Sequence, residues 1–197
     1  ILVDGKIVAA AQEERFSRIK HDSSYPFNAI QFVLDQSKLN WFDGWWKNEP
    51  RNVCENFIKI VWTQFTNVEN KIAGFEYWSN IHQTGGGLNW HVDKDEKLMK
   101  EKKEVVMPNM GLVYYAISEN LEGGYLEIAN SPDREKVEPS KIERLKPIEN
   151  RLIMFNPSYP HRVSPIIGGK RRAIIVNAWP KKPYTFEHSE SYSSYNN

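Results

Sequence analysis

Four residues of this sequence have the types and spacing that metal chemistry requires: His91, Asp93, His161 and Arg171. Two imidazoles and one carboxylate can occupy one face of a ferrous ion and leave the opposite positions open for other ligands. An arginine ten residues beyond the second histidine could hold the far carboxylate of a dicarboxylic acid bound at that metal. Together the four residues predict a metal site that also binds an acid.

The pair His91 and Asp93 is weak evidence by itself. With 5 His and 25 Asp plus Glu among 197 residues, chance supplies roughly 0.6 of a His-x-acid pattern. The pair stands, however, in a short stretch that is expected to be extended, residues 89–93. Side chains two apart in a strand share a face, so both would point the same way. His161 follows 68 residues after Asp93 and suits a ligand from a different strand.

The segment around Arg171 predicts a strand over Arg171–Trp179, after a turn at Gly168-Gly169. Strand alternation places Arg171 on one face together with Asn177, and Arg172 on the other. Arg171 would therefore point into the fold. The alternative is that both arginines are surface charges beside a turn, which would be favoured if no metal residues stood nearby.

Residues from about 72 to 180 resemble the core of the Fe(II)/2-oxoglutarate oxygenases, nearest to the prolyl-4-hydroxylase-like branch. The resemblance rests on the His-x-Asp pair, the distal His, the later Arg, and the stretches GLVYYAIS, GGYLEIA and RLIMFNPSYPHRVSP in the expected order. It implies a mainly β fold with supporting helices, a double-stranded β-helix (jelly roll, cupin-like). It also implies that His91, Asp93 and His161 bind iron and that Arg171 binds the distal carboxylate of 2-oxoglutarate.

Further residues of the predicted pocket are assigned on weaker grounds than the metal ligands and Arg171. Tyr115 matches a family tyrosine that hydrogen-bonds the same carboxylate, but Tyr114 is adjacent and a one-residue slip would exchange their faces. Arg172 likewise remains an alternative to Arg171. On alternation alone, the further residues expected to line the pocket are Asn89, Leu126, Phe155 and Asn177.

The resemblance implies an enzyme that consumes 2-oxoglutarate and O₂ and hydroxylates a C–H bond of a peptide or small-molecule substrate, with release of succinate and CO₂. Two alternatives stay open. One is a noncatalytic cupin-like domain that holds a metal or none. The other is a related oxygenase that repairs alkylated nucleic acid, although the net charge of +1 provides no general attraction to polyanions.

Residues 1–37 carry a second resemblance. The stretch LVDGKIVAAAQEERFSRIKHDSSYPFNAI is similar to the N-terminus of the NodU/CmcH-type carbamoyltransferases. So short a fragment cannot bury the core of those much longer enzymes, so we expect it to be noncatalytic. A carbamoyltransferase-related role for the fragment, fused to the rest, is the remaining alternative. Within it, Asp4-Gly5 predicts a hairpin turn and residues 26–36 predict a short helix.

The expected organisation beyond this fragment is an oxygenase domain over residues 38–185 and a polar tail over 186–197. A support helix is predicted at Asn52–Phe65, with Val53, Phe57, Ile60, Val61 and Phe65 as its apolar positions. Trp41, Trp45 and Trp46 are expected to pack from a loop. The charge-rich segment after Asp93 is expected to be a solvated loop. Strands are expected at 72–80, 88–93, 111–118, 124–130, 151–155 and 171–179.

Composition excludes several classes of protein. Hydrophobic residues make up 40% and aromatic residues 13% of the chain, enough for a packed core. The lone Cys54 excludes an internal disulfide and a cysteine-rich zinc site. No apolar run is long enough to predict a membrane span, and no secretory signal is evident. We therefore expect a cytoplasmic protein with no nucleic-acid or membrane partner, and the sequence leaves its oligomeric state open.

Overall fold

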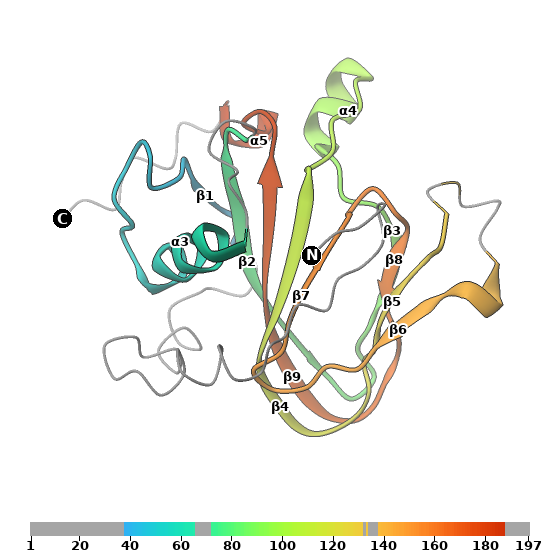
Figure 1. Cartoon of the computed structure of the whole chain (residues 1–197). Coiled ribbons are helices and arrows are strands. Elements are labelled where there is room, and N and C mark those ends of the chain that lie inside the picture. The colour runs from blue at the N-terminus through green and yellow to red at the C-terminus, as the bar shows by residue number, and fades with distance from the viewer. Residues whose placement is uncertain (1–37, 66–71, 132, 134–137, 188–197) are drawn as a thin grey trace.

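The computed structural model describes residues 38–65, 72–131, 133 and 138–187. Two antiparallel sheets lie face to face in it (Figure 1). The five-stranded sheet has the order β1 (Asn40–Phe42), β2 (Gly74–Gln83), β9 (Ile166–Trp179), β4 (Met110–Gly123) and β7 (Leu152–Phe155). The four-stranded sheet has the order β3 (Leu88–His91), β8 (His161–Val163), β5 (Leu126–Ile128) and β6 (Glu143–Leu145). This is the predicted jelly roll.

The five-stranded sheet takes part in two separate apolar cores, and alternation along β4 supplies both. Val113 and Tyr115 point between the sheets, where they join a cluster that includes Leu126 and Phe155. Tyr114 points to the opposite face and joins the cluster beneath helix α3 (Val53–Phe65). The uncertain tyrosine register is thereby settled, since Tyr115 is the residue that faces the space between the sheets.

Helix α3 begins where the sequence predicts, because Asn52 caps it. The Asn52 Oδ1 accepts hydrogen bonds from the backbone N–H groups of Cys54 and Glu55, each at 3.0 Å. The helix covers the outer face of the five-stranded sheet, as expected of a support helix (Figure 1). Its buried stripe differs in part from the prediction, since Val53 and Ile60 are only half-buried. The buried positions are Cys54, Phe57, Ile58, Val61 and Trp62.

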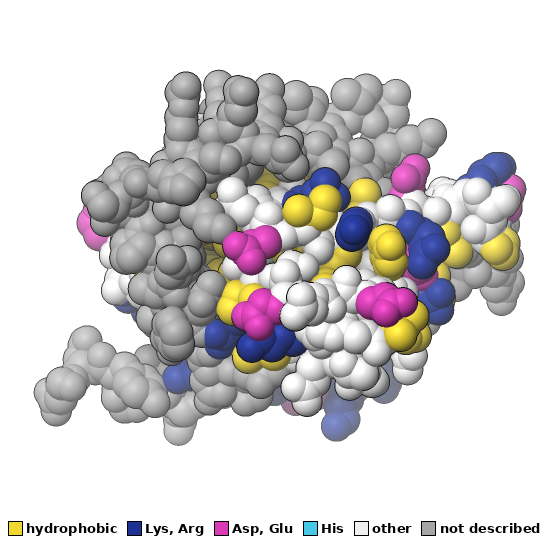
Figure 2. Space-filling view, turned by 90° about the horizontal axis from the view of Figure 1, so that it is seen from below, with side chains coloured by type: hydrophobic (Ala, Val, Ile, Leu, Met, Phe, Trp, Pro, Cys, Tyr) yellow, Lys and Arg dark blue, Asp and Glu magenta, His cyan; other side chains and the backbone are white. Residues whose placement is uncertain are grey.

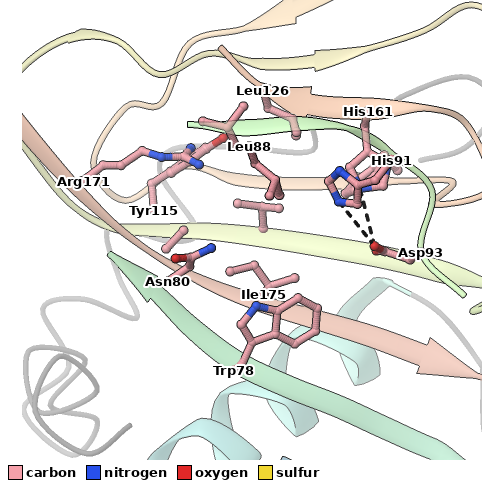
Figure 3. Close-up of a pocket in the computed structure, with 14 residues that line it drawn as sticks. Trp78, Asn80, Leu88, His91, Asp93, Tyr115, Leu126, His161, Arg171 and Ile175 are labelled. Carbon is pink, nitrogen blue, oxygen red and sulfur yellow. Dashed lines mark ion pairs between the residues drawn. The ribbon is translucent and has the colours of Figure 1, made fainter. Parts of the chain in front are cut away.

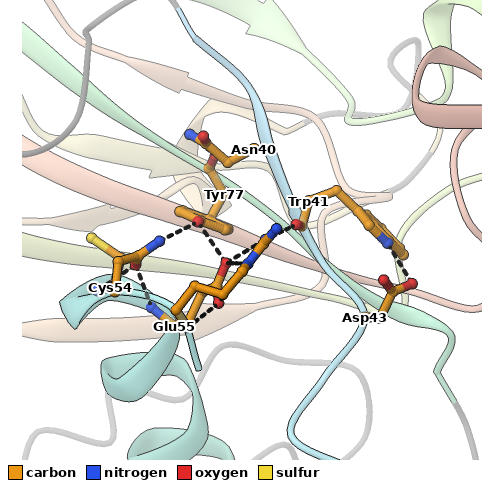
Figure 4. A network of polar contacts seen from close by, with 8 residues as sticks. Asn40, Trp41, Asp43, Cys54, Glu55 and Tyr77 are labelled. Atoms are coloured by element: carbon orange, nitrogen blue, oxygen red, sulfur yellow. Dashed lines mark hydrogen bonds and ion pairs between the residues drawn. The ribbon is translucent and has the colours of Figure 1, made fainter. Parts of the chain in front are cut away.

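A buried carboxylate ties α3 to the first two strands (Figure 4). Glu55 is 0% exposed and accepts hydrogen bonds from the Arg51 guanidinium at 2.6 Å and from the Tyr77 hydroxyl at 3.0 Å. Arg51 also donates to the backbone oxygen of Trp41 at 2.8 Å. Because a buried carboxylate is stable only when it is bonded, this network fixes the helix against β1 and β2.

The three early tryptophans pack, as predicted, although Trp41 does so from strand β1 rather than from a loop. The rings of Trp45 and Trp46 each lie 5.9 Å from the ring of Phe75 on β2. Trp41 pairs instead with Phe186, at 5.6 Å. Phe186 belongs to the short helix α5 (Tyr184–Glu187), so the predicted start of a polar tail at residue 186 falls inside a packed element.

Strand β9 contradicts the predicted turn at Gly168-Gly169. It continues through both glycines, and Gly168 pairs with Glu122 of β4 beside a register shift. Gly169 has φ +76°, and a Cβ at this position would fall on the backbone oxygens of Glu119 and Asn120. The glycines therefore permit a bend and a close approach of two strands, which is another common use of glycine in sheets.

The charged segment after Asp93 also differs from its prediction, since it contains helix α4 (Glu96–Lys102). Asp95 caps this helix by accepting a hydrogen bond from Leu98 N at 3.0 Å, and it accepts a second from Tyr184 N at 2.6 Å. Lys100 and Lys102 lie in the last turn, where they complement the helix dipole. The prediction of a loop rested on the high charge density of the segment and did not consider Asp95 as a helix cap. The 3₁₀ turn Pro139–Lys141 is the remaining helical element of the described residues.

On the underside of the molecule, side chains of both charge signs are interspersed over the described surface (Figure 2). Among the described residues, Lys170 and Glu119 form an ion pair at 3.1 Å. No described helix has the length and apolarity that crossing a membrane would require. The proposed division at residues 37 and 185 stays a prediction, and the hairpin and helix predicted before residue 38 lie outside the described residues.

Candidate functional site

The two predicted histidine ligands stand opposite each other on neighbouring strands. His91 of β3 pairs in register with His161 of β8, and their ring centroids are 4.2 Å apart. Each Nδ1 lies at a backbone oxygen two residues earlier, Asn89 O at 2.8 Å and Tyr159 O at 2.9 Å. A carbonyl requires a donor, so both rings carry the proton on Nδ1 and present Nε2 as a free metal ligand.

Asp93 completes this cluster from the segment just after β3. Its backbone N–H donates to Pro157 O at 3.2 Å, which sets its position. Its Oδ1 lies 3.6 Å from Nε2 of His91 and 3.7 Å from Nε2 of His161, while its Oδ2 accepts a hydrogen bond from Asn177 at 3.1 Å. The ligand atoms of the three side chains all lie within 4.8 Å of one another.

The electrostatics of His161 suit a metal ligand. Burial lowers the pKa of this imidazole, and a nearby His91 acts in the same direction, whereas the Asp93 carboxylate opposes the shift. The ring is therefore neutral at neutral pH, which is the form that binds a metal. Two imidazoles and one carboxylate on one side of a cavity fit ferrous iron with positions left open.

At the other end of the cavity lies a buried arginine. Arg171 is 3% exposed, and its guanidinium lies 5.2 Å from the ring centroid of Tyr115. Within the described part of the chain, the Nε and Nη1 atoms of Arg171 have no hydrogen-bond partner, while the guanidinium and the Tyr115 hydroxyl interact with each other. Burial lowers the pKa of Arg171 and raises that of Tyr115. Buried donors without partners are costly, so this end fits an anionic ligand such as a carboxylate.

His82 stands beside this arginine without adding charge. It pairs in register with Arg171 across β2 and β9. Burial, and then the neighbouring guanidinium, lower the pKa of His82 to about 4. The imidazole is therefore neutral at neutral pH, and Arg171 supplies the positive charge of this end.

One cavity joins the two ends (Figure 3). Its empty volume, with the solvent at its open mouth included, is ≈ 520 Å³. Its middle is apolar, so water is poorly accommodated there. The residues that line it are Trp78, Asn80, Leu88, His91, Asp93, Val113, Tyr115, Leu126, Phe155, His161, Val163, Arg171, Ala173 and Ile175.

Most predicted pocket residues lie on this cavity, including Leu126 and Phe155, and two do not. The side chain of Asn89 is exposed, because a register shift between Leu88 and His91 interrupts the alternation and places Leu88 on the wall instead. Asn177 is 2% exposed and bonds to Asp93 from behind the cavity. Arg172 points away from the cavity, toward Cys54 and the outer face.

Sequence reasoning missed a row of side chains on β2. Trp78 and Asn80 line the cavity, and Glu76 lies on the same face, opposite Asn177. The signal was present, because these positions alternate within a segment that was predicted as a strand. What the sequence did not reveal is that β2 pairs with β9 and so brings this row beside the site.

A jelly roll with a His-Asp-His cluster at one end of its cavity and a buried arginine at the other defines a metal-dependent oxygenase site. Comparison with known families agrees. Residues 77–179 match the model of the 2OG-Fe(II) oxygenase superfamily. The match covers more than half of the chain, which therefore belongs to that superfamily. Members of this superfamily use Fe(II), 2-oxoglutarate and O₂, and the His-Asp-His cluster of this chain could hold the iron.

Solved structures show the same fold at low sequence identity. A Pseudomonas putida prolyl-4-hydroxylase has 17% identity and a TM-score of 0.50, with 72% of each chain covered. A Trichoplax adhaerens prolyl hydroxylase in complex with a hypoxia inducible factor peptide fragment has 15% identity and a TM-score of 0.53, over 93% of this chain and 87% of that one. The viral collagen prolyl hydroxylase of Paramecium Bursaria Chlorella virus-1, in its 2OG complex, has 16% sequence identity and a TM-score of 0.52. The comparison covers 90% of this chain and 96% of that one.

One curated relative matches a short stretch. The protein sll1178 of Synechocystis, described only as uncharacterized, is 48% identical over 40 residues. These residues are 20% of this chain, and the chain spans 6% of that relative's length. The predicted carbamoyltransferase-like fragment, residues 1–37, lies outside the described residues and finds no support in these comparisons.

Proposed function

We propose that the protein hydroxylates a C–H bond of a peptide or small-molecule substrate and couples this to the conversion of 2-oxoglutarate into succinate and CO₂. One atom of O₂ would enter the product and the other would enter succinate. The observation that carries the proposal is the pairing of two unlike ends in one cavity. Three convergent ligand atoms stand at one end, and buried N–H donors of Arg171 without a partner among the described residues stand at the other.

Each end has an assigned task. His91, Asp93 and His161 would hold Fe(II), which when bound supplies the oxidising chemistry together with 2-oxoglutarate and O₂. Arg171 and Tyr115 would bind the distal carboxylate of 2-oxoglutarate through charge-assisted hydrogen bonds. The apolar wall between the ends would exclude water and keep the co-substrate in a single orientation.

The substrate would enter through the open mouth near the metal end. Trp78 on β2 and Leu88 on β3 lie on the two sheets at the cavity wall, and the Leu88 side chain is 42% exposed. An apolar, partly open rim accommodates either a peptide segment or a small molecule. A prolyl hydroxylase that shares this fold holds a peptide, which supports keeping peptides among the candidates.

The test is succinate formation by purified protein with Fe(II) and 2-oxoglutarate under air, across pooled peptides, amino acids and sugars. We expect succinate to depend on Fe(II) and to rise above the substrate-free rate in at least one pool, with a matching mass increase of one oxygen atom in a component. If no pool raises succinate or gains oxygen, hydroxylation of these substrate classes is wrong.

A further inference from the structure

Glu76 carries a buried carboxyl group near the cluster of His91, Asp93 and His161, and it has no role in the proposed reaction. Glu76 on β2 is 9% exposed, and its Oε2 accepts a hydrogen bond from Trp179 Nε1 at 3.0 Å. It forms no ion pair with any other described residue. An acidic side chain in such a place needs a physical reason, because burial without a cation disfavours its charge.

The neighbour of Glu76 across the sheet is Asn177, which stands directly opposite it in the pairing of β2 with β9. Side chains at opposed positions lie on the same face within contact distance. The Asn177 amide donates from Nδ2 to Asp93 Oδ2 at 3.1 Å, and it also acts as a hydrogen-bond donor toward Glu76. An amide nitrogen carries two N–H groups, so one side chain can serve both carboxyl groups.

This arrangement dictates which way the amide faces. If Asn177 were flipped, its Oδ1 would stand against Asp93 Oδ2, and also against the Glu76 carboxylate whenever that group is charged, so that oxygen would oppose oxygen at two contacts. In the observed orientation Oδ1 has no partner and lies beside Gly111, where an added Cβ would come within 3.3 Å of it. Leaving one acceptor unpaired costs less than two repulsive contacts. Glu76 therefore selects the orientation in which the amide donates to Asp93.

The consequence reaches the metal ligand. With Oδ2 bonded to Asn177, the other oxygen of Asp93 is turned toward the two imidazoles, at 3.6 and 3.7 Å from their Nε2 atoms. Trp179 in turn holds Glu76 from behind. The chain of contacts runs from Trp179 through Glu76 and Asn177 to Asp93, and its members come from β2, β9 and the segment after β3.

We propose that Glu76 is a positioning residue for metal binding, which acts through the Asn177 amide to hold the Asp93 carboxylate in its ligating orientation. The inference rests on the proposed metal role of His91, Asp93 and His161. Hydrogen-bond partners of metal ligands commonly contribute 10–100-fold in affinity, which is roughly the effect expected here.

The test is a titration of metal-free protein with Co(II), followed by visible absorption and calorimetry, which requires no catalytic turnover. We expect Glu76→Leu and Asn177→Ala each to weaken Co(II) binding by roughly 10–100-fold. The double variant should bind no more weakly than Asn177→Ala alone, because Glu76 acts only through the amide. The matched control is Glu127→Leu, which removes another buried carboxyl, one held by Arg144 and Arg162 on the outer face of the other sheet. It should leave Co(II) affinity unchanged.

The outcomes separate the two proposals. One outcome is that the unaltered protein binds Co(II), that His161→Ala abolishes this binding, and that Glu76→Leu leaves it intact. This outcome would overturn the positioning role of Glu76 but would support the metal site. Fully additive losses in the double variant would overturn that role as well. If the unaltered protein does not bind Co(II), both proposals fail. Should Glu76→Leu not fold, Trp179→Phe removes the N–H that holds Glu76, and unchanged affinity in that variant would count against the proposal.

Discussion

The two ends of the cavity are built on opposite principles. At the metal end, the ligand side chains are already held: each histidine Nδ1 faces a carbonyl, and Asp93 Oδ2 accepts from Asn177. At the other end, the Nε and Nη1 donors of Arg171 are buried and, within the described residues, have no partner. One end is pre-organised, and the other is left unsatisfied.

This difference indicates how each end contributes to binding. A site whose ligands are already oriented gives up little conformational entropy when a cation arrives. A site with unpaired buried donors is destabilised while empty and regains that free energy when an anion binds. The metal end should therefore bind its ion without the co-substrate, whereas the arginine end should matter only when 2-oxoglutarate is present.

The largest expected effect comes from removing a ligand at the metal end. His161→Ala should reduce Fe(II)-dependent succinate formation to background and weaken Co(II) binding by more than about 100-fold, beyond what partners of ligands contribute. Metal titration and a succinate assay measure the two effects. Full activity in this variant would end the assignment of the cluster as the iron site.

Replacing the arginine should affect only the co-substrate. Arg171→Ala removes charge-assisted hydrogen bonds worth about 1.5–3 kcal/mol, so the KM for 2-oxoglutarate should rise by roughly 10–100-fold. Co(II) affinity measured without 2-oxoglutarate should stay as it is. Arg172→Ala is the matched control, because that side chain points away from the cavity, and it should leave the KM unchanged. Equal effects of the two variants would contradict the assignment.

The support behind the metal end should be visible as a pH dependence of stability in metal-free protein. Burial raises the pKa of Glu76 to about 7, although the hydrogen bond from Trp179 opposes the shift. In the unfolded chain a glutamate titrates near about 4.3, so the folded state keeps a proton that the unfolded state has lost. This contribution to stability is fully present below about pH 4.3 and is lost as the pH rises through about 7.

In the unaltered protein, the free energy of unfolding should therefore fall by on the order of 1–3 kcal/mol between about pH 5 and pH 8. In Glu76→Gln this fall should be absent. Chemical denaturation at several pH values measures it. An identical pH profile for the two proteins would show that Glu76 keeps its ordinary pKa.

The smallest expected effect comes from the tyrosine hydroxyl at the arginine end. Tyr115→Phe removes one hydrogen bond to the co-substrate, worth about 0.5–1.5 kcal/mol, so the KM for 2-oxoglutarate should rise by roughly 2–10-fold. Tyr114→Phe should instead leave this KM unchanged and lower the stability of the protein, since the Tyr114 hydroxyl bonds to Asn150 at 3.0 Å. An unchanged KM in Tyr115→Phe would contradict the role assigned to the Tyr115 hydroxyl.

The sequence predicted most strands and the support helix correctly, but it did not predict helix α4 or the path of the chain at Gly168 and Gly169. The six expected strands all exist, and the Asn52 cap and helix α3 follow from local patterns that act over a few residues. The segment with α4 was predicted as a loop because its charges obscured the Asp95 cap. The glycines at 168 and 169 were predicted as a turn, because whether glycine turns or bends a strand depends on the strand that lies beside it.

For the site, the sequence by itself determined which side chains share a face. Two-residue spacing put Arg171 with Asn177, because this local period holds wherever a strand forms. It does not account for the pair His91 and Asp93, since β3 ends at His91 and the backbone of Asp93 is held by Pro157 O. Only the tertiary structure decided what each face meets. The register shift in β3 turned Asn89 away from the cavity, and the pairing of β2 with β9 brought Glu76 beside Asn177. Strand pairing joins residues far apart in the chain, so no local pattern records it.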